Sequence, residues 1–458
     1  MKKLPFIKKE NGIATLFVDG EPFIILGGEI HNSSSSSLEY MERVWSNIKG
    51  LHLNALLVPV YWELVEPEED KFDFSIVGSI IQRAREENIR LVLLWFGLWK
   101  NGESNYVPGW VKKDYNRYFR ACYPGSIKSN TISPLCTEAV KADAKAFKNL
   151  MRYIKEVDEG NNTVIMMQVE NEIGFLGSDR DYSDAANEKF EEEVPSEVRL
   201  IYGKSGNWTQ VFGEEAGEYF MAYHYARAVE QIAKAGSEEY PIPMYVNAWL
   251  QQYPDRAGFY PSGGPIAKVV KMWKATAPTI SLYAPDVYVP YFIDVCAEYS
   301  LNDNPLFIPE VRKDVSSVTN VFYAIGKHNA LGYCPFGIED LQDPGARISE
   351  DDIDMELVKA LNIDVNAIFN IENTAYYLSQ CYKLLGDMMG IIDKYRGTGK
   401  MTGFLQNNDN GCILPFSEYD LHIKYKKQVE SRPKSGGLVI EISKNEFIFV
   451  GIGFSVDF

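Results

Sequence analysis

The sequence contains few cysteines, and none of them lies close to another. No two of the six have the short spacing that tetrahedral metal sites and redox motifs use. We therefore expect no cysteine-based metal centre, and we expect free thiols of the kind found in a reducing cytoplasm. The six are Cys122, Cys136, Cys296, Cys334, Cys381 and Cys412.

Long apolar segments are also missing. Nowhere do the roughly 18 uncharged apolar residues that a membrane-spanning helix requires run together. The basic start of the chain, Met1–Glu10, lacks the apolar core of a signal peptide. The sequence therefore predicts neither a membrane span nor export by this segment, and a cytoplasmic location is expected.

Positive charge is scarce as well. The chain has 46 Lys and Arg residues against 63 Asp and Glu residues, which gives a net charge of -17. An acidic chain without a visible basic patch repels polyanions, so nucleic acid and anionic membranes are not expected as partners. With 46% hydrophobic and 24% charged residues, the composition is that of a globular protein with a large core.

Apolar, strand-like runs recur along the chain with helix-like stretches between them, for example 37–51 and 75–87. This alternation indicates a parallel sheet covered by helices. Eight such runs favour a closed (β/α)8 barrel over an open doubly wound sheet. No Gly-x-Gly-x-x-Gly follows the first run, which removes the main dinucleotide-binding alternative. The runs are 23–28, 55–60, 89–95, 163–169, 244–247, 279–283 with 287–289 behind it, 306–308 and 331–334.

The predicted fold class is therefore α/β, a (β/α)8 TIM barrel with an N-terminal β-hairpin and a smaller C-terminal β-rich domain. A charged, Gly-rich insertion at 178–218 predicts a long loop with extra helices. The chain ends inside an apolar β-like stretch, so its last strand is either terminal or cut short. We expect the hairpin at 1–22, the barrel at 23–360, linking helices at 361–397 and a β module at 398–458, with helices at 350–361 and 376–395.

Two of the runs end in carboxylates. Glu170, Asn171 and Glu172 follow the fourth run, and Glu310 follows the seventh. In a barrel the carboxyl ends of the strands meet on one face, which carries the active site. Two carboxylates there suggest glycoside hydrolysis, in which one protonates the leaving oxygen and, in a retaining enzyme, the other attacks the anomeric carbon. Alternation points Glu170 and Glu172 the same way on an extended strand, so it does not decide which is the acid.

Polar and aromatic residues crowd the same predicted face. Amides and acids hydrogen-bond sugar hydroxyls, while flat rings cover the C–H faces of a pyranose. Asn171 is the candidate to bind the 2-hydroxyl, and Tyr288 and Tyr291 are the candidates to hydrogen-bond Glu310. The predicted substrate-binding residues are Asn171, Glu29, His31, Tyr61, Trp62, Glu63, Trp99, Asn101, Asn247, Trp249, Tyr288 and Tyr291.

Several segments carry a family resemblance. They read Gly-Gly-Glu-Ile-His at 27–31, Leu-Asn-Ala at 53–55, Tyr-Trp-Glu-Leu-Val-Glu-Pro-Glu-Glu at 61–69, Phe-Asp-Phe at 72–74 and Gln-Val-Glu-Asn-Glu-Ile-Gly at 168–174, together with Glu310. In these segments the chain resembles the clan A glycoside hydrolases, and within them the family 35 and family 42 β-galactosidases. The resemblance covers about residues 20–340. It implies that Glu172 is the acid/base and Glu310 the nucleophile.

The sequence also departs from those families. Family 35 galactosidases carry Cys-Ala-Glu-Trp after the third strand, where Ala and Glu contact galactose; here residues 99–103 read Trp-Lys-Asn-Gly-Glu. Pro59 and Glu63 stand where the family has Tyr and Asn, and the zinc-binding cysteines of family 42 are absent. The two carboxylates remain, so the resemblance implies the bond-breaking chemistry and leaves the sugar open.

We therefore expect a retaining exo-β-glycosidase that releases terminal non-reducing β-D-galactosyl residues by a two-carboxylate double displacement. The alternatives are a β-glycosidase for glucosides, xylosides or arabinopyranosides, and a carbohydrate-binding barrel that has lost catalysis. The expected partner is a β-linked oligosaccharide or glycoside. Acid, nucleophile and water suffice for this chemistry, so no metal or organic cofactor is expected. A homo-oligomer stays open.

Overall fold

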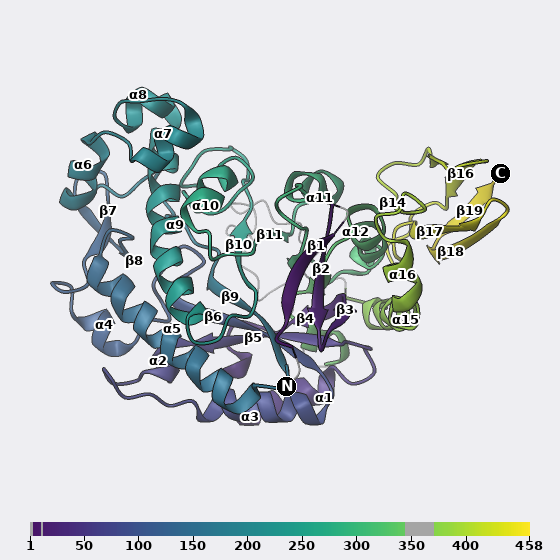
Figure 1. Ribbon diagram of the computed structural model, residues 1–458, viewed down its shortest axis with the longest axis horizontal. Helices are drawn as coiled ribbons and strands as arrows, with labels where there is room; N and C mark the ends of the chain where they lie inside the picture. The colour runs from purple at the N-terminus through teal and green to yellow at the C-terminus, as the bar shows by residue number, and fades with distance from the viewer. Residues whose placement is uncertain (1–2, 11, 344–370) are drawn as a thin grey trace. The chain divides into compact units, whose positions relative to one another are not determined.

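Eight parallel strands form a closed barrel in the computed structural model, which describes residues 3–10, 12–343 and 371–458 (Figure 1). Around the barrel the strands follow the order β10-β11-β12-β13-β4-β5-β6-β9. The predicted fold class is confirmed. The strands are β4 (Ile25–Glu29), β5 (Ala55–Tyr61), β6 (Arg90–Lys100), β9 (Val164–Asn171), β10 (Met244–Trp249), β11 (Leu282–Val287), β12 (Ile308–Val311) and β13 (Gly332–Pro335).

The sixth barrel strand differs from its prediction. The sequence suggested two apolar pieces, 279–283 and 287–289, whereas β11 is one strand, Leu282–Val287. Asp286 lies inside this strand and is buried. An acidic residue in a buried strand interrupts the apolar pattern from which a strand is predicted. The pattern therefore predicts two pieces, one on each side of Asp286.

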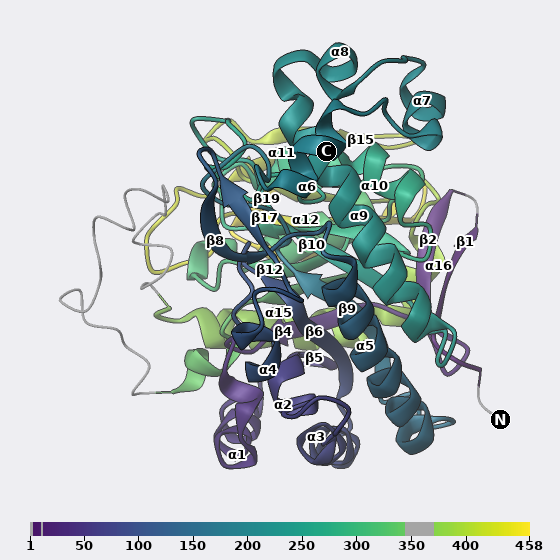
Figure 2. The same cartoon turned by 90° about the vertical axis from the view of Figure 1, so that its left-hand side faces the viewer.

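The described chain divides into two compact units, in which residues 58–286 and 287–458 are the largest segments. In the first unit, the long helices α5 (Thr137–Asp158) and α9 (Ala216–Ser237) run side by side (Figures 1 and 2). Phe147, Leu150, Met151 and Ile154 of α5 are buried. Their spacing of three and four residues places them on one helix face, which explains why this face packs inward.

Extra elements follow β6 and β9 in the first unit. The helices α6 (Asp184–Glu191), α7 (Ser196–Tyr202) and α8 (Trp208–Phe212) occupy the stretch between β9 and α9. This confirms the predicted insertion with extra helices. An antiparallel pair, β7 (Arg120–Tyr123) and β8 (Ile127–Ile132), was not predicted.

The second unit holds the remaining barrel strands, most of the N-terminal sheet and the C-terminal end of the chain. The predicted hairpin is confirmed as β2 (Ile13–Val18) and β3 (Glu21–Phe23), and β1 (Phe6–Glu10) completes a three-stranded sheet. The helix expected at 376–395 is observed as α15 (Thr374–Asp387) followed by α16 (Met389–Tyr395). The helix expected at 350–361 lies outside the described residues.

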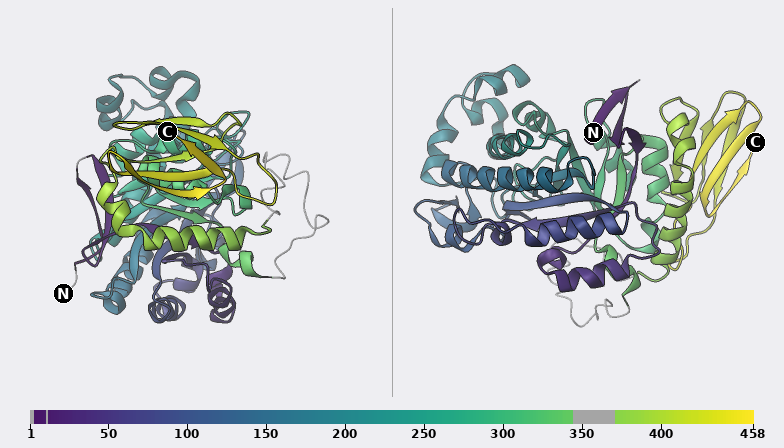
Figure 3. Two further views of the ribbon diagram at one scale, coloured as in Figure 1. Left: turned by 90° about the vertical axis from the view of Figure 1, so that its right-hand side faces the viewer. Right: turned by 60° about the horizontal axis from the view of Figure 1, so that its bottom comes forward.

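Two antiparallel three-stranded sheets form the C-terminal module (Figure 3). Phe404, Leu421, Ile423 and Val439 come from both sheets and make a common apolar core. Because each sheet buries one face against the other, the module has a core of its own. Its strands are β14 (Met401–Leu405), β17 (Gly436–Ser443) and β18 (Glu446–Ile452) in one sheet, and β15 (Cys412–Pro415), β16 (Asp420–Tyr425) and β19 (Phe454–Asp457) in the other.

The module packs on helix α12 (Asn320–His328), which lies shortly after β12 in the chain. The contact is made by backbone: a Cβ on Gly403 would lie 2.5 Å from the carbonyl oxygen of Phe322 and 2.9 Å from Cα of Tyr323. A Cβ on Gly326 would similarly lie 2.7 Å from the amide nitrogen of Gly403. Two glycines therefore allow the strand and the helix to touch.

All six cysteines are free thiols, five of them buried and Cys412 partly buried. This confirms the prediction that none is paired. Within residues 3–10, 12–343 and 371–458, no helix is long and apolar enough to cross a membrane.

We predict that Gly403→Ala lowers the free energy of unfolding by about 1–3 kcal/mol, since the added methyl group must displace backbone of α12. The matched control is Gly386→Ala in α15, where a Cβ meets nothing within 4 Å. An exposed helix interior gains stability from this change, by about 0.5–1 kcal/mol. Urea denaturation of both variants measures the difference. Equal stability of the two would contradict the tight contact at Gly403.

Candidate active site

Glu170 and Glu172 lie at the end of β9, where the backbone leaves the extended conformation. The φ angles are +63° at Glu170 and +44° at Glu172, in the left-handed region that side chains other than glycine seldom adopt. The alternation rule therefore does not apply here. The two carboxylates, which the sequence could not separate, have different surroundings.

Asn247 of β10 links two acidic residues. Its Oδ1 accepts a hydrogen bond from the backbone N–H of Glu172 at 2.9 Å, and its Nδ2 donates to Oδ2 of Asp286 at 2.7 Å. All three residues are buried. A single amide that donates on one side and accepts on the other thus fixes both the chain at Glu172 and the carboxylate of Asp286.

Glu310 of β12 has a phenol as its partner. The hydroxyl of Tyr288 donates to Oε2 of Glu310 at 2.8 Å, and Glu310 is only 4% exposed. This confirms the prediction that one of the two candidate tyrosines hydrogen-bonds Glu310. The bond orients one oxygen of this carboxylate.

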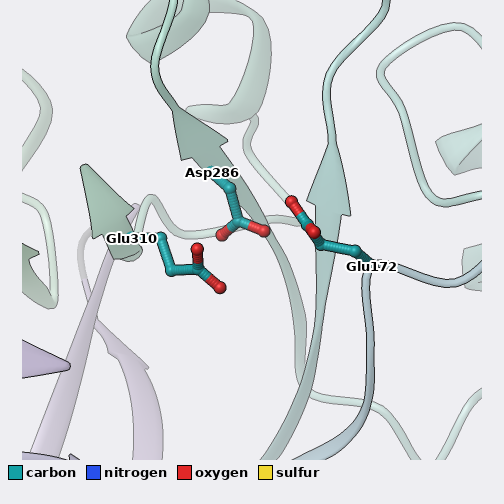
Figure 4. A group of neighbouring side chains, drawn as sticks. All are labelled: Glu172, Asp286 and Glu310. Carbon is teal, nitrogen blue, oxygen red and sulfur yellow. The ribbon is translucent and has the colours of Figure 1, made fainter. Parts of the chain in front are cut away.

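Glu172, Asp286 and Glu310 form one group of carboxylates (Figure 4). One oxygen from each lies within 4.8 Å of the other two. Like charges this close in a buried site repel one another. Such an oxygen donor set also suits a hard cation such as Ca²⁺ or Mg²⁺, although an acidic cluster alone does not specify an ion.

Asp286 is the functional candidate that the sequence prediction left out of the site. Its signal was weak, because one acidic residue at a strand end is common and the strand itself was divided at this point. What reveals Asp286 is its bond to Asn247 and its distance to the two glutamates.

Glu170 belongs to a second carboxyl pair with Asp143 of α5, and both are fully buried. Glu170 accepts hydrogen bonds from the backbone N–H groups of Trp99 at 2.7 Å and Leu98 at 3.2 Å. Asp143 accepts from the N–H of Leu98 at 2.8 Å and from the indole N–H of Trp95 at 2.7 Å. The pair thus binds the irregular end of β6 to the end of β9.

Burial shifts the protonation of both acids. It raises the pKa of Asp143 to about 6, although the bonds from Glu170 and Trp95 act in the opposite direction. Burial, the charge of Asp143 and their mutual hydrogen bond raise the pKa of Glu170 well above its usual value. Glu170 is therefore the partner that keeps the proton, and its carboxyl group donates a hydrogen bond to the ionised Asp143. Gly97 leaves the space for this pair, because its Cβ would lie 2.3 Å from Oδ2 of Asp143 and 2.7 Å from Oε1 of Glu170.

Three predicted substrate-binding aromatics have partners inside the protein. Trp62 and Trp99 are fully buried, and their indole N–H groups donate to Oε2 of Glu66 and to the carbonyl oxygen of Ile132. The hydroxyl of Tyr61 bonds Oγ of Ser35 at 2.8 Å. These contacts give the three side chains structural roles, and substrate contact at them stays an untested prediction.

The other predicted binding residues are distributed around the strand ends. Glu29, Asn171 and Asn247 are buried, whereas Tyr288 and Tyr291 are 37% and 46% exposed. His31, Glu63, Asn101 and Trp249 are partly buried. Three of these have charged partners: His31 bonds Asp340 at 2.7 Å, Glu63 pairs with Lys112 at 2.8 Å, and Asn101 accepts a hydrogen bond from the ammonium of Lys100.

Comparison with known families gives the relationship of the chain. A model of glycosyl hydrolases family 35 matches residues 15–257, which is more than half of the 458 residues. The chain belongs to glycosyl hydrolases family 35. A second model, a domain of unknown function (DUF5597), matches residues 378–458, which include the C-terminal module.

Curated relatives are β-galactosidases and β-galactosidase-like proteins. The beta-galactosidase of Xanthomonas manihotis is 26% identical over 176 residues, a match that covers 37% of this family 35 chain and 27% of that protein. Beta-galactosidase 17 of Arabidopsis thaliana is 28% identical over 179 residues, covering 39% of this chain and 24% of that protein. The matched part is thus about a quarter of each relative's length.

Solved structures support the fold. A beta-galactosidase from Bacillus circulans sp. alkalophilus is 16% identical with a TM-score of 0.52, covering 80% of this chain and 57% of that one. A beta-galactosidase from Rahnella sp. R3 is 12% identical with a TM-score of 0.53, covering 81% of this chain and 57% of that one. At these identities the likeness concerns the barrel fold alone.

The carboxyl pair predicts opposite results for two amide variants. Glu170→Gln should cost little, since its NH2 group can donate to Asp143 and its oxygen can accept from Trp99, while only the longer bond from Leu98 is lost. Asp143→Asn should lower the free energy of unfolding by about 1–3 kcal/mol, because its NH2 group must face the N–H of Leu98 or of Trp95. Chemical denaturation at fixed pH measures both. Equal losses would contradict the assignment of the proton to Glu170.

The same pair predicts how stability depends on pH. Both acids have folded pKa values above their unfolded values, so this contribution is greatest at low pH and is lost as pH rises through the folded values. Glu66 is the other acid whose charge acts on Asp143. As pH rises above the unfolded pKa values, the native protein should lose more stability than Glu170→Gln does. Parallel pH profiles would contradict a shared proton.

Proposed function

We propose that the chain is a retaining β-glycosidase that acts on terminal β-D-galactosyl residues, with Glu172 as acid/base and Glu310 as nucleophile. The observation that carries the proposal is the approach of these two carboxylates, whose oxygens lie within 4.8 Å at the carboxyl ends of barrel strands. Membership of glycosyl hydrolases family 35 agrees with it. The whole protein's activity is proposed from a match to part of its relatives.

The mechanism has two steps. In the first, Glu172 gives its proton to the glycosidic oxygen while Glu310 attacks the anomeric carbon, and a covalent glycosyl-enzyme forms as the aglycone leaves. In the second, Glu172 removes a proton from water, which attacks the anomeric carbon and releases Glu310. Tyr288 holds one oxygen of Glu310 by a hydrogen bond of 2.8 Å, which orients the carboxylate for attack.

The separation of the two carboxylates supports the retaining course. Retaining enzymes hold their two carboxyl groups about 5–5.5 Å apart, whereas inverting enzymes need about 6.5–9.5 Å to admit a water molecule. The approach of one oxygen pair to within 4.8 Å supports the shorter class. Asp286 belongs to the same group of carboxylates and stabilises a positively charged transition state.

Galactose is proposed as the sugar from the names of the relatives, two of which are called beta-galactosidases. The altered residues 99–103 and Glu63 favour testing glucosides, xylosides and arabinopyranosides as the second candidate. Glu63 forms an ion pair with Lys112, a contact that a hydroxyl-binding amide would not make. The free thiols fit a reducing compartment such as the cytoplasm.

The test is a panel of aryl β-galactoside, β-glucoside, β-xyloside and α-L-arabinopyranoside substrates. We expect the galactoside to be hydrolysed with the highest kcat/KM. Glu310→Gln should lower kcat at least about 10³-fold while thermal unfolding stays unchanged, since the nucleophile is lost and the shape is kept. Glu298→Gln, an exposed acid of helix α11 (Phe292–Tyr299), is the matched control and should keep full activity. Wild-type rates in Glu310→Gln would eliminate it as the nucleophile.

The acid role of Glu172 predicts a dependence on the leaving group. Glu172→Gln should slow the hydrolysis of an alkyl β-galactoside far more than that of a dinitrophenyl β-galactoside, because the dinitrophenolate leaves without a proton. The ratio of the two kcat/KM values in wild type and variant is the measurement. A ratio that does not change would assign the acid role to another residue.

A further inference from the structure

A cavity of about 650 Å³ lies in the second unit, between the C-terminal module and the loops that follow β11 and β12. Barrel residues 287–294, 311–312 and 316–320 contribute to its lining, and so do residues 405–409, Gln428 and Lys434 of the module. Val287 and Val311 adjoin Asp286 and Glu310 in the sequence. The cavity therefore borders the same strand ends that carry two of the three carboxylates.

Hydrogen bonds fix the module at this cavity. The hydroxyl of Thr319, at the start of α12, donates to the carbonyl oxygen of Lys434 at 3.0 Å. Within the module, Oε1 of Gln406 accepts from the backbone N–H of Ser435 at 3.0 Å. Together with the glycine contact at Gly403, these bonds hold the lining loops on the helix. A wall built in this way is available to a ligand without prior rearrangement.

Asn320 carries an amide group that a ligand could bond. It is the first residue of α12, is 7% exposed and lines the cavity. In the described part of the chain, its side-chain amide forms no hydrogen bond with another residue. The polar atoms of this amide are accessible from the cavity, so they can bond a ligand there. A ligand that both donates and accepts hydrogen bonds would satisfy it.

The rest of the lining indicates the ligand class. Amides face the cavity from the module as Asn407 and Gln428, and aromatic rings come from Tyr291 and Phe292. The charged lining residues balance, with Arg312 and Lys434 against Asp294 and Asp409. A balanced lining gives an anion no net attraction. Amides with aromatic rings are the combination that binds hydroxyl groups and the C–H faces of sugars.

We propose that this cavity binds a neutral saccharide, so that the C-terminal module takes part in carbohydrate binding. The saccharide is either the far end of the substrate molecule or a separate glycan chain, and the chemistry is the same. The proposal rests in part on the proposed glycosidase function, which supplies the reason for a sugar beside the strand ends. Tyr291, predicted for the substrate site, belongs to this cavity.

The first test is calorimetric titration of the full-length Glu310→Gln chain, which does not turn over, with β-1,4-galactotriose. Adding Asn320→Ala should weaken binding at least about threefold, since a hydrogen-bonding amide is lost. Asn407→Ala, on an exposed loop that tolerates substitution, should act in the same direction. Asn410→Ala removes an amide from the same loop outside the cavity and should change nothing. Equal affinity in all variants, or no binding of the trisaccharide, overturns the proposal.

A second measurement identifies the source of the saccharide. In the otherwise native chain, Asn320→Ala should leave kcat/KM for an aryl β-galactoside unchanged. If kcat/KM for galactotriose falls, the cavity holds the far end of the substrate; if it does not, while titration shows weaker binding, a separate glycan binds there. Both results support a saccharide site. Absence of all hydrolysis by the native chain would refute the proposed function and leave the titration result standing.

Discussion

The close approach of three buried carboxylates is the constraint on which the rest of the site depends. Glu172, Asp286 and Glu310 place oxygens within 4.8 Å of one another while each is less than a tenth exposed. Charges so placed repel, and burial removes the water that would screen them. Hydrogen bonds from neighbouring residues offset part of this repulsion. Asn247 bonds Asp286 and the backbone at Glu172, and Tyr288 bonds Glu310.

A second pair of acidic residues, Glu170 and Asp143, has a structural role. Glu170 and Asp143 are fully buried and receive four hydrogen bonds from residues 95–99 of β6. Only two residues separate Glu170 from Glu172, yet their environments differ because the backbone between them turns through positive φ angles. Environment, more than residue type, separates a structural acid from a reactive one. The pair stabilises the chain immediately before the proposed acid/base.

The C-terminal module is held within the second unit by close packing. It has its own apolar core, and it contacts α12 through glycines that permit backbone to touch backbone. The helix α12 lies shortly after the strand that carries Glu310, so the module and the proposed nucleophile are supported by one stretch of chain. A module docked in this way restricts the loops above β12, and this is how it can take part in recognition without supplying a catalytic group.

The sequence by itself determined the barrel, the hairpin and the inserted helices, and it made Glu172 and Glu310 the candidate catalytic pair. Apolar runs and helical periodicity are local patterns, and each strand-end carboxylate stands next to such a run. Only the tertiary structure separated Glu170 from Glu172, added Asp286 and gave Trp62 and Trp99 internal partners. These depend on backbone torsion and on contacts between residues far apart in the chain, such as Asn247 with Asp286. Such contacts cannot be predicted from spacing along the sequence, because they form only when the strands close into a barrel.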